Sequence, residues 1–67
     1  MRIELVFVKN EEVVWKEKRK IEKIDEKVLK SLKEEFEAED CDYVDIFVEK
    51  ELPDGERYFE YYDSIVF

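Results

Sequence analysis

The sequence predicts a single α+β domain. A β-hairpin, a helix and a second β-hairpin follow one another and form a four-stranded, mostly antiparallel sheet with the helix on one face. Three observations predict this fold. Apolar residues alternate at a period of two near both ends of the chain, they recur at three- and four-residue steps in the middle, and a Pro-Asp-Gly turn divides the last third. Because 67 residues have room for only one hydrophobic core, residues 1–67 are expected to form one domain.

The first hairpin is predicted at residues 2–9 and about 12–20. The first strand is apolar on both faces, as a central strand is, with Ile3, Leu5 and Phe7 on one face and Val6 and Val8 on the other. Polar residues between the two strands predict the turn. Lys16, Lys18 and Lys20 alternate on one face of the return strand, which is typical of an edge strand protected against unwanted pairing.

The helix is predicted at about residues 25–38. Its apolar stripe, continued from the segment before it, consists of Ile21, Ile24, Val28, Leu29, Leu32 and Phe36. Asp25 is expected to cap the amino terminus. Carboxylates between Glu37 and Asp40 crowd the carboxyl terminus, where the helix dipole favours cations, and the sequence shows no compensation for them.

The second hairpin is predicted at about residues 42–51 and 57–67, around the turn formed by Pro53, Asp54 and Gly55. Simple alternation places two apolar sets on opposite faces: Val44, Ile46, Val48, Tyr62 and Val66 on one, and Tyr43, Phe47, Phe59, Tyr61, Ile65 and Phe67 on the other. One helix covers one face of a sheet, so one set is expected to be exposed as an interface. The alternative is a strongly coiled sheet, in which long Tyr and Lys side chains lie over part of this set. Trp15 is expected to extend that exposed set from the second strand.

The first and last strands are the most apolar, which predicts that they pair at the centre of the sheet, in the strand order 2-1-4-3. In its order of elements this arrangement resembles the β-grasp architecture of ubiquitin-like and immunoglobulin-binding bacterial domains. Ubiquitin-like modifiers and sulfur carriers end in Gly-Gly, whereas this chain ends in Ser64-Ile65-Val66-Phe67. The resemblance therefore implies a fold, and neither conjugation nor sulfur transfer is expected.

Charge is divided unevenly along the chain. Residues 1–33 hold ten basic and seven acidic side chains, and residues 34–67 hold two and thirteen, for a total of −8. Fourteen Glu and nine Lys, with no His, Gln or Thr, resemble the composition of hyperthermophile proteins. A designed surface has a similar composition, so a de novo designed protein without biological function is an alternative.

The residue types that most enzymes use are missing, so no catalytic residue is assigned. Without histidine, the commonest general acid-base and the usual nucleophile pairs cannot be built. Asp40 and Asp42 flank Cys41 and are expected to raise its pKa, which disfavours a reactive thiolate. The protein is therefore expected not to be an enzyme and to carry no cofactor.

Metal, nucleic-acid and membrane binding are also not expected. Glu37, Glu39, Asp40, Asp42 and Asp45 supply carboxylates, but without the pattern and central glycine of an EF-hand. The lysine-rich stretch from 16 to 30 is interrupted by glutamates in a chain of charge −8, which disfavours nucleic acid. No apolar run approaches 18 residues, and the one cysteine fits a reducing interior, so a cytoplasmic protein is expected.

Protein–protein contact is the function that the sequence favours. The expected partner is either a second copy, in a homodimer, or a protein with a basic surface. The residues expected to make the contact are Asp45, Glu49, Glu60, Tyr43, Phe47, Phe59 and Tyr61. An alternative is an inhibitor that mimics DNA, because alternate carboxylates on a strand lie about 6–7 Å apart, close to the phosphate spacing of a nucleic-acid strand.

Overall fold

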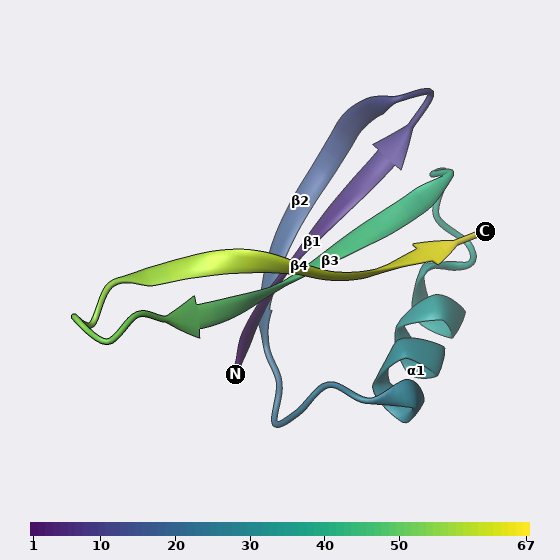
Figure 1. The fold of residues 1–67 in the computed structure, drawn as a ribbon. Helices are drawn as coiled ribbons and strands as arrows, with labels where there is room; N and C mark the ends of the chain where they lie inside the picture. Colours follow the sequence, from purple (N-terminus) through teal and green to yellow (C-terminus); the bar gives the residue numbers. More distant parts are fainter.

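The computed structural model describes residues 1–67 and consists of two β-hairpins joined through one helix (Figure 1). Its elements are β1 (Arg2–Lys9), β2 (Glu12–Lys20), α1 (Glu26–Phe36), β3 (Tyr43–Glu51) and β4 (Arg57–Val66). The predicted ββαββ order is confirmed, and each boundary lies within two residues of the prediction. All strand pairs are antiparallel, and the order across the sheet is β2-β1-β3-β4.

The predicted strand order 2-1-4-3 is wrong. β3, and not β4, pairs with β1, in a register that places Ile3 opposite Val48 and Phe7 opposite Val44. β4 forms an edge of the sheet, so the parallel central pair of the β-grasp architecture is absent. The aliphatic residues of β3 are fully buried, whereas Ile65 is the only buried residue of β4. Much of the apolar content of β4 is tyrosine, whose hydroxyl favours a partly solvated edge over the centre of a sheet.

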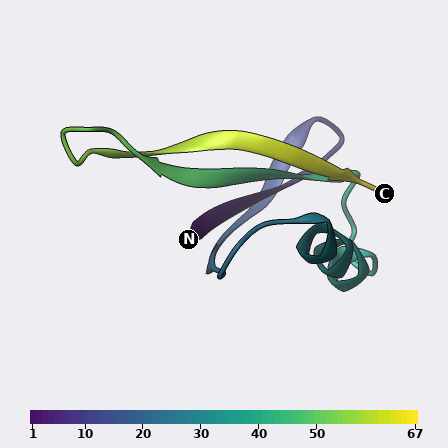
Figure 2. The same ribbon diagram turned by 60° about the horizontal axis from the view of Figure 1, so that its bottom comes forward.

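The hydrophobic core lies between α1 and one face of the sheet (Figure 2). Its nine buried residues are Ile3, Leu5, Phe7, Leu32, Phe36, Val44, Ile46, Val48 and Ile65. α1 is about 16 Å long, while the molecule extends over 39 Å, so the helix covers only part of the sheet. Ile21 and Ile24, in the segment that leads to the helix, pack against the core as well.

Both ends of α1 follow from local chemistry. The side chain of Asp25 accepts a hydrogen bond from the backbone N–H of Val28 at 3.0 Å, which confirms it as the N-cap. The helix ends at Phe36, two residues earlier than predicted, and turns replace it among the carboxylates from 37 to 40. The structure contains no helix with the length and hydrophobicity needed to cross a membrane.

A register shift in each hairpin changes which side chains share a face. Val14 is the extra residue in β2, and Tyr62 is the extra residue in β4. Beyond Tyr62 the alternation is inverted, because a β-bulge inserts one residue into a pattern with a period of two. Ile65 therefore faces the helix and Val66 faces away from it, opposite to the predicted grouping.

Candidate interaction surfaces

The face of the sheet opposite α1 has no element packed on it and is called the open face (Figure 2). Residues that are directly opposite each other on antiparallel strands lie on the same face. The strand registers therefore assign the apolar part of the open face to Val6, Val8, Val13, Tyr43, Phe47, Phe59, Tyr61 and Val66.

Six of the seven residues that the sequence proposed for partner binding lie together on the open face: Tyr43, Asp45, Phe47, Glu49, Phe59 and Tyr61. Glu60 does not join them, because it pairs with Val48 on the helix side. Trp15 also lies on the helix side, opposite Phe7, so the expectation that it extends the open face is wrong. The bulge at Val14 changes the alternation of side chains along β2. It nevertheless leaves the indole of Trp15 on the helix side.

A small network of side chains fixes the centre of the open face. The rings of Phe47 and Tyr61 contact each other edge to face, with centroids 5.8 Å apart. The hydroxyl of Tyr61 lies 2.7 Å from the Ser64 hydroxyl, which donates to the Asp45 carboxylate at 2.5 Å. Two of the predicted aromatic residues and one predicted carboxylate are therefore held in one arrangement.

The open face is curled, so that its two edge strands approach each other. The ammonium of Lys18 on β2 lies 5.2 Å from the ring centroid of Phe59 on β4, although β1 and β3 lie between these strands. Val6 and Val8, on the open face of the inner strand β1, are only 7% and 5% exposed without any second layer. The sheet thus shields its central apolar residues itself, while Tyr61 stays 56% exposed.

The carboxylates of the second hairpin do not form one continuous row. Glu49 lies on the open face and is paired with Arg2 at 3.7 Å and Arg57 at 3.2 Å. Asp45 accepts from a serine, and Glu60 and Asp63 lie on the helix side. The carboxylates of this hairpin are therefore divided between the two faces of the sheet.

A second surface is a groove on the helix side, between β2 and the carboxyl end of α1. Its volume is about 310 Å³. Trp15, which is 63% exposed, lies at the groove on the edge strand. The lining consists of Phe7, Val14, Trp15, Glu17, Arg19, Glu35, Phe36, Glu39, Asp40 and Cys41.

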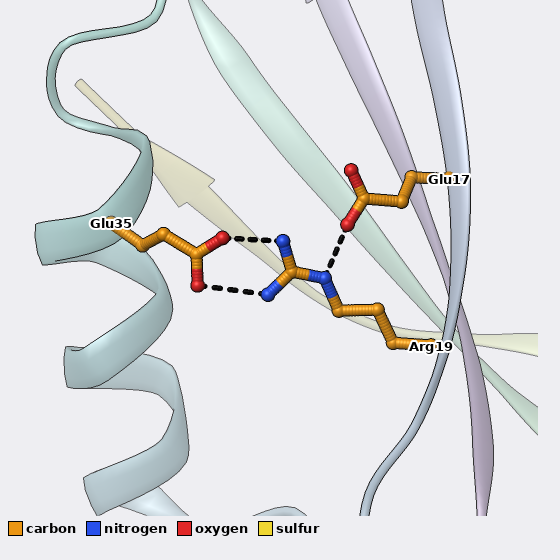
Figure 3. Close-up of polar contacts among 3 residues, drawn as sticks. All are labelled: Glu17, Arg19 and Glu35. Atoms are coloured by element: carbon orange, nitrogen blue, oxygen red, sulfur yellow. Dashed lines mark hydrogen bonds and ion pairs between the residues drawn. The ribbon is translucent and has the colours of Figure 1, made fainter.

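Arg19 crosses this groove from β2 to α1 (Figure 3). Its guanidinium binds both oxygens of Glu35 on the helix, and its Nε also donates to Glu17. It lies over the ring of Phe36, 5.0 Å from the centroid. The hydrogen bonds from Arg19 hold the pKa of Glu35 below its ordinary value.

The charged side chains that line the groove are four carboxylates and one guanidinium, a formal charge of −3. Burial, followed by the charges of Glu39, Asp42 and Asp40, raises the pKa of the Cys41 thiol, as the sequence predicted. Lys9 pairs with Asp40, whereas Glu39 takes part in no ion pair. The sequence showed the carboxylates at the end of the helix, but the groove that Glu39 and Asp40 line was not predicted from it.

The acidic residues considered as metal ligands do not converge. Asp40 is paired with Lys9, Asp42 accepts from the backbone N–H of Asn10, and Asp45 accepts from Ser64. No group of three or more suitable side chains is placed to hold an ion.

The chain was compared with families, sequences and structures of known proteins. It matches no protein-family model, no curated protein and no solved structure. The assignment of a function therefore depends on the two surfaces themselves.

Proposed function

We propose that this is a non-enzymatic protein that acts by protein–protein contact through the open face of its sheet. The observation that supports the proposal is an aromatic sheet face with no element packed on it, centred on Phe47 and Tyr61. Tyrosine and phenylalanine are enriched in protein interfaces. The ordered network around Tyr61 reduces the entropy that this surface would lose on binding.

The charge of the open face favours a second copy as the first partner to test. Its charged side chains are Arg2, Lys16, Lys18, Lys20 and Arg57 against Glu4, Asp45, Glu49 and Glu51. Five basic and four acidic groups give this face +1, so the remainder of a molecule of charge −8 carries −9. Two copies that meet through their open faces would bring together the part of the surface with the least repulsion.

Light scattering after size exclusion, across protein concentration and salt, tests this proposal. The expected result is a species of twice the 8.3 kDa chain mass, favoured by salt because screening weakens the repulsion between the acidic surfaces. Tyr61→Lys should shift it towards monomer. Tyr58→Lys is the matched control, since Tyr58 is similarly exposed at 43% on the same strand but lies on the helix side.

A monomer at every concentration and salt would contradict self-association. A dimer disrupted equally by both substitutions would contradict the assignment to the open face. A protein with a basic surface is the other partner considered, and it would face the acidic remainder of the molecule.

A further inference from the structure

The carboxyl end of α1 carries an electrostatic conflict that the fold only partly relieves. The negative end of the helix dipole favours cations, yet Glu35, Glu39 and Asp40 lie there. Arg19 and Lys9 neutralise part of this charge, and Glu39 remains without a basic partner. Four carboxylates against one guanidinium line the groove. Departures from local rules of this kind are expected where a protein binds something.

Three aromatic side chains line the walls of the groove. Phe7 and Phe36 contact each other edge to face at 4.8 Å, and the exposed indole of Trp15 lies on the same groove. Indole is the aromatic group that binds cations best. The groove already holds one guanidinium against an aromatic ring and carboxylates, because Arg19 lies over Phe36 while bound to two carboxylates.

We propose that the groove between β2 and the carboxyl end of α1 binds an arginine side chain presented by a partner protein. The guanidinium would stack on Trp15 and face Glu39. A volume of about 310 Å³ is at the lower limit for ligand pockets, which suits one long side chain. This surface lies on the opposite side of the sheet from the open face, so the inference goes beyond the proposed function.

Arginine is preferred to lysine for physical reasons. The guanidinium is planar, stacks on aromatic rings, and is more weakly hydrated than an ammonium group, so it loses less on leaving water. Bound beside Glu39, it would add positive charge at the negative end of the helix. The attraction is electrostatic, so added salt should weaken it.

The experiment uses Trp15, the only tryptophan in the chain, as a fluorescent reporter. The intact protein is titrated with an acetylated and amidated pentapeptide that has one arginine between pairs of glycines. Two further peptides carry lysine or citrulline instead, and citrulline has nearly the shape of arginine without its charge. A saturable change in emission is expected with arginine, weaker binding with lysine, and no response with citrulline.

Matched variants test the location by calorimetric titration of the arginine peptide. Glu39→Gln should weaken binding about two- to fivefold, as expected for one solvent-exposed charge pair. Glu34→Gln removes the same charge from an exposed position of α1 outside the groove and should leave binding unchanged. Trp15→Ala should weaken binding as well, and a thermal melt of each variant establishes that it is folded.

Three results would overturn the proposal. Citrulline could bind as well as arginine, the two glutamine variants could bind equally, or Tyr61→Lys could abolish binding. The last result would place the arginine peptide on the open face. Because Tyr61→Lys is expected to affect self-association and not the peptide, the two proposals can fail independently.

Discussion

Arg19 on edge strand β2 and Glu35 on α1 form a two-point ion pair that joins the sheet to the helix across 16 positions of sequence (Figure 3). The pair supplies a cation near the carboxyl end of α1, where the helix itself provides only Lys33 in its last turn. The sequence places carboxylates at the negative end of the helix dipole, and a basic residue from another element partly compensates for them.

Arg19→Met should lower the free energy of unfolding by about 1 kcal/mol at neutral pH. The substitution keeps a long apolar side chain near Phe36 but removes the ion pairs and the cation–π contact, which are partly exposed to solvent. Urea denaturation measures the change. Arg19→Lys keeps the charge but not the two-point geometry, so its free energy of unfolding should lie between those of the parent and Arg19→Met. A methionine variant as stable as the parent would contradict the prediction.

The same pair predicts a dependence on pH. Glu35 has a folded-state pKa below its ordinary value of 4.5, so its carboxylate binds protons more readily in the unfolded chain. The resulting stability is present above the unfolded-state pKa and is lost as pH falls through the folded-state value. The difference between the parent and Arg19→Met should be constant above about pH 6 and shrink in acid. A stability difference between the two proteins that grows as the pH falls would contradict this prediction.

Glu11→Gly should stabilise the protein. Asn10 and Glu11 join β1 to β2 with φ angles of 52° and 65°, and glycine adopts such left-handed angles more readily than glutamate does. The expected gain is up to about 1 kcal/mol, reduced by the greater freedom of glycine in the unfolded chain. Glu12→Gly, inside β2, is the control and should destabilise. A thermal melt distinguishes the two directions.

Gly55→Ala should destabilise the second hairpin by about 1 kcal/mol. Gly55 has a φ of 90°, and a Cβ added there would meet no atom within 4 Å. The cost is therefore conformational and not steric. Gly55→Asn should cost less, because asparagine tolerates left-handed angles better than alanine. Equal losses for the two variants in urea denaturation would contradict this explanation.

Leu32→Ala should unfold a large fraction of the molecules. Leu32 and Phe36 are the only buried residues of α1, the only helix on the sheet. Removing a buried leucine costs about 2–5 kcal/mol, and a core of this size supplies only about 3–5 kcal/mol in total. Lys27→Ala, at an exposed position of the same helix, should change stability little. Circular dichroism at 25 °C compares the two.

Cys41 should react slowly with iodoacetamide at neutral pH. Burial and the nearby carboxylates raise the pKa of its thiol from its ordinary value, which lowers the fraction present as thiolate. Glu39→Gln should shift the pH at half-maximal alkylation rate downwards, since Glu39 is the first of the three carboxylates that raise it. The protein in concentrated urea is the reference with an ordinary cysteine. A folded protein that reacts as fast as this reference would contradict the prediction.

The sequence alone determined the elements and their chemistry, because these depend on local patterns. Periods of two and of three to four residues located the strands and the helix, the carboxylate of Asp25 identified the N-cap, and the Pro-Asp-Gly turn located the second hairpin. The aromatic residues Tyr43, Phe47, Phe59 and Tyr61 were correctly grouped on one face, since no bulge separates members of this set on the same strand.

Only the tertiary structure decided which strand pairs with β1 and which residues meet across elements. The number of apolar residues favoured β4 for the centre, but the burial of Val44 and Ile46 against the helix placed β3 there. The bulge at Tyr62 reversed the faces of Ile65 and Val66, and Arg19 bonds to Glu35 across the groove between β2 and α1. Each outcome depends on long-range register and packing, in which a shift of one residue changes every contact, and a local sequence pattern does not encode that shift.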